Sequence, residues 1–304
     1  MKIVFMGTPD FAVASLSALL DAGFEIAGVI TAPDKPAGRG QKISESAVKK
    51  FAIEKGLRVL QPVRLKDPEF LDELHSINAD LQAVVAFRML PELVWNMPPK
   101  GTINLHASLL PQYRGAAPIN WAIINGEKES GVSTFFLKQE IDTGDILFTE
   151  KVKIEEEDTA GDLHDKLMNI GSKLLVKTVK AIESGEYKEI PQDHIDIREL
   201  KTAPKIFRED CQINWDKPTS QVFNLIRGLS PYPASFSTLQ DKILKIYKAR
   251  PEFTTHQQKP GSIQTDHKTY LKFACKDGWI SVLELQLEGK KRMMIDEFLR
   301  GVRL

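Results

Sequence analysis

The residues best suited to chemistry by type and spacing lie in one stretch, 104–115, which reads Asn-Leu-His-Ala-Ser-Leu-Leu-Pro-Gln-Tyr-Arg-Gly. Asn104 and His106 follow an apolar run and stand two residues apart. If they end a strand, side-chain alternation places the amide and the imidazole on one face, beyond the strand's carboxyl end, where open α/β sheets bind ligands. The pair indicates either a hydrogen-bond donor beside a proton-transfer group or a structural histidine with a polar neighbour.

A carboxylate further along the chain is a candidate third member of this group. Asp142 lies in the segment 138–145, between two predicted strands over 131–137 and 146–154. Strands joined in this way predict a hairpin with a long loop. Taken alone, an aspartate before Thr-Gly is typical of a turn, and only proximity to His106 would give it a function.

The elements that must position these residues begin as a Rossmann-like sheet. Residues 2–6 predict a buried first strand, and a helix then runs to about Ala22, with Thr8 as its N-cap and Pro9 in its first turn. A second strand follows over 25–31. This βαβ opening implies a parallel sheet. The glycine pattern G-x-G-x-x-G is missing from it, which argues against a dinucleotide site.

The length of 304 residues favours two domains, because one core rarely serves so long a chain. The first part predicts further helices over 44–55, 68–76, 118–125 and 159–183 and strands over 57–60, 81–87 and 102–105. From residue 209, a helix over 219–227 and short strands over 243–249, 270–274 and 280–286 are typical of a small β-barrel. We expect an α/β catalytic domain over 1–189, a linker over 190–208 and a β-barrel domain over 209–304.

The segment 32–43 is expected to be an exposed irregular loop, because two prolines and two glycines fall within it. Its cations Lys35, Arg39 and Lys42 make it basic in a chain whose formal net charge is zero. Such a loop is either simply solvated or holds a phosphate backbone. The barrel segment is mildly basic, and the same two interpretations apply to its clusters Lys242, Lys245, Lys248 and Lys290-Lys291-Arg292.

Composition argues against several classes of protein. With a formal net charge of zero, the chain lacks the overall positive charge that is typical of a nucleic-acid-binding protein, although a local basic patch remains possible. Cys211 and Cys275 stand far apart and form no C-x-x-C pair, which argues against a zinc site or a disulfide framework and fits a reducing cytoplasm. The N-terminal apolar run ends at Gly7, too early for a signal peptide, and no stretch approaches the ~20 apolar residues of a membrane span. We expect a cytoplasmic protein without membrane contact.

Three motifs together resemble those of the folate-dependent formyltransferases: Asn104-x-His106, Ser108-Leu-Leu-Pro111-x-x-Arg114-Gly115 and Asp142-Thr-Gly-Asp145. The similarity covers nearly the whole chain and is most specific to the members that act on initiator tRNA. It is carried there by Gly7-Thr-Pro-Asp-Phe-Ala12, Pro33-Asp-Lys-Pro-Ala-Gly-Arg-Gly40, Gln61-Pro62, Arg114-Gly-Ala-Ala-Pro118 and Ile213-Asn-Trp215. The resemblance implies a Rossmann-like formyltransferase domain followed by an OB-like β-barrel domain.

The resemblance also implies a reaction: the formyl group of 10-formyltetrahydrofolate moves to the α-amino group of methionyl initiator tRNA, in support of translation initiation. In the family an Asn, a His and an Asp at these motifs are catalytic. Asn104 would donate to the developing oxyanion, and His106 would donate or shuttle a proton. Asp142 would orient the ring and favour its protonated form. The amine is itself the nucleophile, so neither a covalent intermediate nor a metal is expected.

Partner sites follow from the same resemblance. Folate contacts, mostly through backbone groups, are implied for Ser108, Leu109, Leu110 and Pro111. Contacts with the tRNA acceptor end are implied for Lys35, Arg39 and Lys42, with Arg39 as the best single candidate. The barrel would follow the acceptor arm through its phosphates. We expect a monomer whose partners are folate and initiator tRNA.

One departure and four alternatives stay open. Where the family often has Tyr-Gly beside the folate pocket, this chain has Phe87-Arg88, so the arginine either reshapes the pocket or points away from it. A sugar-nucleotide N-formyltransferase shares the catalytic core. A glycinamide ribonucleotide formyltransferase would lack the second domain, and a nicotinamide dehydrogenase would need the missing glycine pattern. A non-catalytic RNA-binding protein would not need Asn104, His106 and Asp142 together.

Overall fold

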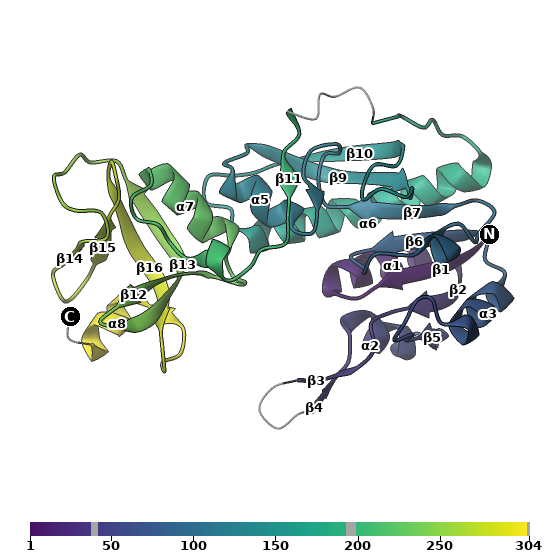
Figure 1. Cartoon of the computed structure of the whole chain (residues 1–304), viewed down its shortest axis with the longest axis horizontal. Helices are drawn as coiled ribbons and strands as arrows, with labels where there is room; N and C mark the ends of the chain where they lie inside the picture. Colours follow the sequence, from purple (N-terminus) through teal and green to yellow (C-terminus); the bar gives the residue numbers. More distant parts are fainter. Residues whose placement is uncertain (38–41, 193–198, 303–304) are drawn as a thin grey trace. The chain divides into compact units, whose positions relative to one another are not determined.

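The structure, a computed structural model, describes residues 1–37, 42–192 and 199–302 (Figure 1). These form two compact units that interleave along the chain. Unit 1 comprises Met1–Gly115, Gly131–Val152 and Asp165–Thr202, and unit 2 comprises Ala116–Ser130, Lys153–His164 and Ala203–Leu304. The predicted linker, 190–208, lies partly outside the described residues, and the domain boundaries at 189 and 209 remain a prediction.

Unit 1 is built on a sheet of seven described strands in the order β10-β9-β7-β6-β1-β2-β5. These are β1 (Lys2–Gly7), β2 (Glu25–Ile30), β5 (Val59–Leu60), β6 (Leu81–Val85), β7 (Thr102–His106), β9 (Glu129–Phe136) and β10 (Ile146–Lys153). The five from β1 to β7 in this sheet pair in parallel, whereas β9 is antiparallel to β7. The predicted Rossmann-like sheet is confirmed, with an antiparallel side that begins at β9.

Short helices cover this sheet and connect its parallel strands. They are α1 (Asp10–Asp21), α2 (Ala47–Glu54), α3 (Pro68–Ile77) and α4 (Glu92–Trp95). The α2 and α3 helices begin where the side chains of Ser46 and Asp67 accept hydrogen bonds from backbone N–H groups of the first turn. On one face of the sheet, Val4, Met6 and Val84 share a buried apolar cluster with residues of α3 and α4.

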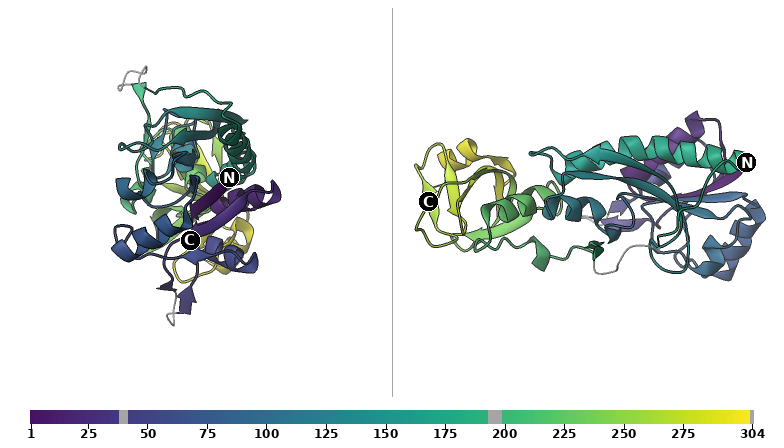
Figure 2. Two further views of the ribbon diagram at one scale, coloured as in Figure 1. Left: turned by 90° about the vertical axis from the view of Figure 1, so that its right-hand side faces the viewer. Right: turned by 90° about the horizontal axis from the view of Figure 1, so that it is seen from above.

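The long helix α6 (Ala160–Ser184) runs along β9 and β7, as the view from above shows (Figure 2). The hydroxyls of Thr178 on α6 and Thr134 on β9 are 2.8 Å apart. A Cβ at Gly171 would lie 3.1 Å from Leu105 Cδ2, so the helix backbone approaches Leu105 closely. Because side chains alternate along a strand, Asn104 and His106 point to the side of β7 away from α6. This confirms that the two share a face.

Two predictions near the N-terminus are wrong. Thr8 is not the N-cap of α1: the cap is Pro9, whose carbonyl accepts the first helical hydrogen bond from Ala12, and no side chain caps the helix. The segment 32–43 is not wholly irregular, because β3 (Lys35–Ala37) and β4 (Lys42–Ser44) pair as an antiparallel ribbon. Proline is tolerated in a two-stranded ribbon, where both strands are edges, and sequence composition alone therefore misled the prediction.

Unit 2 holds a curled antiparallel sheet, a half-barrel, with β12-β13-β16-β15-β14 in order and β17 beside β16 (Figure 1). The strands are β12 (Ser235–Leu239), β13 (Lys242–Glu252), β14 (Ile263–Thr265), β15 (Leu271–Ala274), β16 (Trp279–Leu287) and β17 (Met293–Met294). Its helices are α5 (Pro118–Ile124), α7 (Thr219–Gly228) and α8 (Ile295–Gly301). The predicted class of an α/β domain with a β-barrel-like second domain is confirmed, although β12, β14, β17 and α8 were not foreseen.

Contacts inside unit 2 explain why a helix from the middle of the chain belongs to it. The amide of Asn120 on α5 donates to the Gly228 carbonyl on α7 at 2.7 Å. A Cβ at Gly228 would lie 2.6 Å from Ile124 Cγ1, so the two helices are in close contact. The first turn of α7 is capped by Asp277, whose carboxylate accepts from the Thr219 backbone N–H at 2.7 Å and from its hydroxyl at 2.8 Å. The remaining short elements are β8 (Arg114–Gly115), β11 (Thr202–Ala203) and a 3-10 turn at Glu209–Cys211.

Candidate active site

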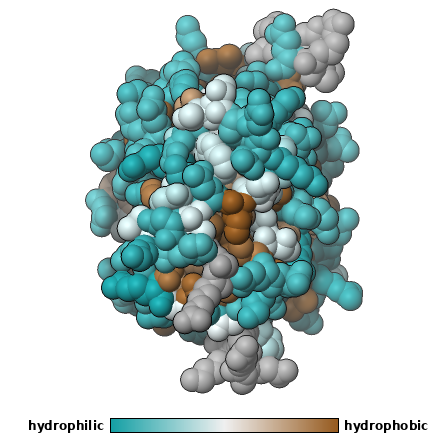
Figure 3. Space-filling view, turned by 90° about the vertical axis from the view of Figure 1, so that its left-hand side faces the viewer, coloured by the Kyte–Doolittle hydropathy of each residue, from teal (hydrophilic) through white to brown (hydrophobic). Residues whose placement is uncertain are grey.

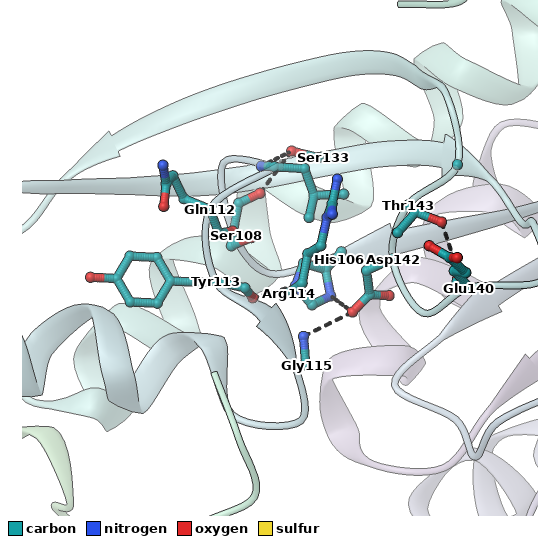
Figure 4. Close-up of polar contacts among 12 residues, drawn as sticks. His106, Ser108, Gln112, Tyr113, Arg114, Gly115, Ser133, Glu140, Asp142 and Thr143 are labelled. Carbon is teal, nitrogen blue, oxygen red and sulfur yellow. Dashed lines mark hydrogen bonds and ion pairs between the residues drawn. The ribbon is translucent and has the colours of Figure 1, made fainter. Parts of the chain in front are cut away.

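The predicted catalytic histidine lies at the carboxyl end of β7, and only 7% of it is exposed. Its Nε2 is 2.9 Å from the Tyr113 carbonyl oxygen. A carbonyl can only accept, so Nε2 must carry the proton and donate it. This leaves Nδ1 as the nitrogen that faces the Asp142 carboxylate, at 3.8 Å from Oδ2. The structure thus brings His106 and Asp142 together, as Figure 4 shows.

The carboxylate of Asp142 has a second partner from the loop after β7. The backbone N–H of Gly115 donates to Asp142 Oδ2 at 2.9 Å, so one carboxylate oxygen faces both Gly115 and the imidazole (Figure 4). Asp142 itself has a φ of 55°, in the left-handed region, which costs a non-glycine residue about 1–2 kcal/mol. Two residues on, a Cβ at Gly144 would lie 1.6 Å from the Phe136 carbonyl oxygen, so only glycine fits there. The backbone conformation of the loop between β9 and β10 is therefore constrained at Asp142 and Gly144.

Asn104 lies two residues before the histidine, with its backbone paired to Val84 of β6 and Phe135 of β9. Its side chain is half-buried. Among the residues that the structure describes, none forms a hydrogen bond with the Asn104 side chain. An amide that is held by a strand and keeps its N–H groups available can donate to a ligand atom.

The predicted folate loop, Ser108 to Pro111, is held mainly by Ser133 of β9. The Ser133 hydroxyl donates to the Ser108 carbonyl at 2.7 Å and accepts from the Leu110 backbone N–H at 3.0 Å. The buried Ser108 hydroxyl donates to the Gln112 carbonyl at 2.6 Å. Leu110 is buried against Phe135 and Ile146. The side chains of Ser108 and Leu110 therefore stabilise the loop itself, while Leu109 and Pro111 are half-buried.

The structure leaves the predicted tRNA-binding cations untested. Lys35 lies in β3 and is exposed, Lys42 begins β4, and Arg39 lies outside the described residues. The base of this ribbon is well held. Asp34 pairs with Lys49 and also accepts from Gln61 Nε2 at 2.8 Å, and these hydrogen bonds hold the pKa of the Asp34 carboxyl below its usual value. Gln61 also donates to the Ala32 carbonyl at 2.8 Å.

The structure shows what the unusual arginine of Phe87-Arg88 contacts. The Arg88 guanidinium donates to the Val63 carbonyl at 2.9 Å and to the Pro62 carbonyl, and it lies 5.5 Å from the centre of the Phe87 ring. Partial burial lowers the pKa of Arg88. The arginine therefore fastens the segment after β6 to the segment after β5, and its charge is directed at backbone carbonyls.

Sequence reasoning missed several groups that surround the pair. Tyr113 was not singled out, yet its carbonyl orients His106 and its own N–H donates to the Lys201 carbonyl at 2.6 Å. Gln192 was placed in a linker, yet it contacts the loop of Asp142. Ser133 could have been found from strand register, because it pairs with His106 in the sheet. Nothing local marks Tyr113 or Gln192.

The described residues contain no group of three or more His, Cys, Asp or Glu that could hold a metal ion. Both cysteines are buried and unpaired by disulfides. In the part of the chain that the structure describes, no helix combines the length and the apolar composition that a membrane crossing requires.

Comparison with known proteins identifies relatives of the whole chain. The family model described as "Formyl transferase" matches residues 1–179, and the one described as "Formyl transferase, C-terminal domain" matches residues 205–303. The chain is 54% identical over 310 residues to a protein of Bacteroides fragilis named methionyl-tRNA formyltransferase. This alignment covers 100% of this chain and 96% of that protein. The protein of that name from Flavobacterium johnsoniae is 51% identical over 306 residues, covering 99% and 96% of the two chains.

Solved structures share the fold at lower identity. The sugar 3N-formyl transferase WlaRD, solved in the presence of dTDP and 5-N-formyl-THF, superposes with a TM-score of 0.69 at 23% identity, over 96% of this chain and 99% of that chain. HypX from Aquifex aeolicus in complex with tetrahydrofolic acid has a TM-score of 0.68 at 19% identity, over 99% of this chain and 48% of that one. With two family matches and full-length relatives above half identity, the chain belongs to the formyltransferase family, among its methionyl-tRNA formyltransferases.

Proposed function

We propose that this chain transfers the formyl group of 10-formyltetrahydrofolate to the α-amino group of methionyl initiator tRNA. The full-length relatives at 51–54% identity are named methionyl-tRNA formyltransferase, which supports formyl transfer to a methionyl-tRNA. The observation that supports the chemistry best is the pair of His106 Nδ1 and Asp142 Oδ2, 3.8 Å apart at the end of β7. A carboxylate beside an oriented imidazole is an arrangement suited to proton transfer.

The reaction needs an oxyanion donor and a path for one proton. The neutral amine attacks the formyl carbon, the C=O electrons move to oxygen, and the bond to N10 of the folate breaks as the carbonyl re-forms. The nitrogen that attacked loses a proton, and N10 gains one. Asn104, whose amide is not engaged by any described residue, would donate to the oxyanion. A preorganised donor of this kind is worth about 3 kcal/mol in the transition state.

His106 would handle the proton through Nδ1. Its Nε2–H is occupied by the Tyr113 carbonyl, and this contact fixes the ring plane. Nδ1 faces the carboxylate at a distance longer than a hydrogen bond, so a substrate atom can share that nitrogen. Asp142 would orient the imidazole, and Gly115 would in turn hold Asp142. A positioned acid or base of this kind contributes roughly 10²–10⁴-fold to the rate.

The tRNA would be bound by cations on both units. In unit 1 the candidates are Lys35 in β3, Lys42 in β4 and Arg39, which lies outside the described residues. In unit 2, Lys248 and Arg250 are exposed on β13, whereas Arg292 is paired with Glu284 at 2.6 Å. Seen from the side of unit 2, the surface is mostly hydrophilic with scattered hydrophobic groups (Figure 3). Binding through phosphates would weaken as salt rises.

The remaining expectations also stay proposals: a monomer that works in the cytoplasm, with 10-formyltetrahydrofolate as co-substrate and no resident metal. The folate would lie against the loop of Ser108, Leu109, Leu110 and Pro111 and contact mainly its backbone, since the Ser108 and Leu110 side chains are engaged in the loop.

The deciding experiment offers three acceptors in parallel with 10-formyltetrahydrofolate: methionyl initiator tRNA, methionyl elongator tRNA and a 4-amino sugar nucleotide. We expect transfer to the initiator tRNA alone. Transfer to the sugar nucleotide would keep the catalytic assignment and overturn the tRNA assignment. Hydrolysis of the folate without transfer to any acceptor would contradict the proposal as a whole.

A further inference from the structure

A buried glutamine lies in the stretch between the two family matches. Gln192 follows residue 179, where the first match ends, and precedes residue 205, where the second begins. Only 7% of Gln192 is exposed. A glutamine is seldom so buried unless its amide is fully hydrogen-bonded, so its partners show what it holds in place.

The amide N–H groups of Gln192 hold the loop that carries Asp142. Nε2 donates to the Asp142 carbonyl at 3.1 Å and to the Gly144 carbonyl at 2.6 Å. One of these carbonyls belongs to Asp142 itself, whose φ of 55° is left-handed, and the other lies two residues later. Fixing both carbonyls fixes the direction in which the Asp142 side chain leaves the backbone.

The amide oxygen of Gln192 holds the strand that faces this loop. Its Oε1 accepts from Arg114 Nε at 3.3 Å and from the terminal guanidinium nitrogen NH2 at 2.8 Å. The next residue, Gly115, is the one whose N–H binds Asp142 Oδ2 at 2.9 Å. Gln192 therefore joins the two backbone segments that together place the carboxylate, one through its donor and one through its acceptor.

The position of Gln192 is itself determined by the sheet. Two residues earlier, Ile190 exchanges two backbone hydrogen bonds with Ile146, the first residue of β10, both at 2.9 Å. The segment thus continues the edge of the sheet in unit 1. Gln192 therefore lies two residues from a pair of backbone hydrogen bonds to the sheet, and a residue that positions a catalytic group needs such support.

We propose that Gln192 is a positioning residue for formyl transfer, which acts by holding the Asp142 carboxylate against His106. The inference rests on the proposed function, because it assumes that Asp142 serves the reaction. It assigns a catalytic purpose to a segment that sequence alone predicted to be a linker.

The test compares Gln192→Ala and Gln192→Glu with the unchanged chain in formyl transfer to methionyl initiator tRNA. The glutamate variant keeps the size of the side chain and an acceptor for Arg114 but has no N–H for the two carbonyls. We expect both variants to lose roughly 10²-fold in kcat, the scale of a misplaced catalytic group, with the KM for folate and for tRNA within about twofold. Gln82→Ala is the matched control: this glutamine is buried in β6 and accepts from the Thr102 hydroxyl at 3.0 Å, so its loss should lower Tm without changing kcat.

A double-mutant cycle separates this role from a general structural one. In an Asp142→Ala background, Gln192→Ala should change kcat by less than about twofold, since the group that it positions is gone. An equally large loss of kcat in both backgrounds would overturn the inference, and so would full turnover by a folded Gln192→Glu chain. If Asp142→Ala alone keeps normal turnover, the catalytic assignment of Asp142 fails instead, and the two failures are thereby distinguished.

Discussion

Replacing His106 with alanine removes a ring that makes two different contacts. Nε2–H donates to the Tyr113 carbonyl at 2.9 Å, and Nδ1 faces Asp142 Oδ2 at 3.8 Å. The second contact, with Asp142, affects the rate of the reaction. Loss of a positioned acid or base should lower turnover by roughly 10²–10⁴-fold, or about 2.7–5.4 kcal/mol of activation free energy. The first contact, with the Tyr113 carbonyl, affects stability. A buried carbonyl left without its donor costs about 1–3 kcal/mol of unfolding free energy.

A second variant separates these two effects. In His106→Gln, the amide nitrogen can reach the place of Nε2 and donate to the Tyr113 carbonyl, but the side chain cannot take up or release a proton near neutral pH. Both variants should lose turnover, and only His106→Ala should also lose stability. Substitution of the exposed His75 by alanine is the control for a histidine outside the site.

The assay is single-turnover formyl transfer at saturating folate and methionyl initiator tRNA, with tRNA affinity and thermal unfolding measured on the same preparations. We expect tRNA affinity to stay within about twofold of the unchanged chain, because a change confined to the transition state leaves ground-state binding intact. Turnover by His106→Gln close to that of the unchanged chain would refute the reasoning, since the imidazole would then serve only to hold Tyr113.

Three further predictions concern the loops and unit 2. Arg39→Ala should weaken tRNA binding and reduce the slope of log affinity against log salt concentration by about one, with the KM for folate unchanged. An unaltered tRNA titration would show that Arg39 does not contact the tRNA. Arg88→Ala removes the hydrogen bonds to the carbonyls of Pro62 and Val63, so it should lower the free energy of unfolding by about 1.5–3 kcal/mol in a urea titration. It should also raise the KM for folate; an unchanged KM would show that these hydrogen bonds do not shape the folate pocket. Asp277→Ala removes the cap of α7 and should cost about 1 kcal/mol at neutral pH. The Thr219 hydrogen bonds lower the pKa of Asp277 in the folded chain, so this stabilisation is present above the pKa of the unfolded carboxyl and is lost as pH falls through the folded value; a cost that stays constant into acid would contradict the assignment.

The division of information between sequence and structure is clearest around β7. Alternation along a strand was enough to predict that Asn104 and His106 share a face, and the close approach of α6 to Leu105 confirms it. The same holds for α7, which begins at Thr219 as predicted, and for the two strands joined by the loop of Asp142. Each of these depends on residues that are neighbours in sequence. Local periodicity and turn chemistry are therefore sufficient for them.

Resemblance to known motifs added the chemistry that local patterns could not supply. Asp142 before Thr143-Gly144 is by itself an ordinary turn, and only the joint occurrence of three motifs indicated a catalytic role. Family models and full-length relatives confirm the family. They do not test the role of any single residue, so the assignments of Asn104, His106 and Asp142 stay predictions.

Tertiary structure alone decided which atoms hold the site. The backbone N–H of Gly115 reaches a carboxylate 27 residues away in sequence, Gln192 reaches Gly144 over 48 residues, and Arg88 reaches the Val63 carbonyl over 25. Such hydrogen bonds have no sequence period, because they depend on where the chain returns after whole elements have been placed. The amino-acid sequence by itself therefore predicted the strands and helices around β7, the resemblance added the candidate catalytic side chains, and only the folded chain showed which atoms hold these side chains in place.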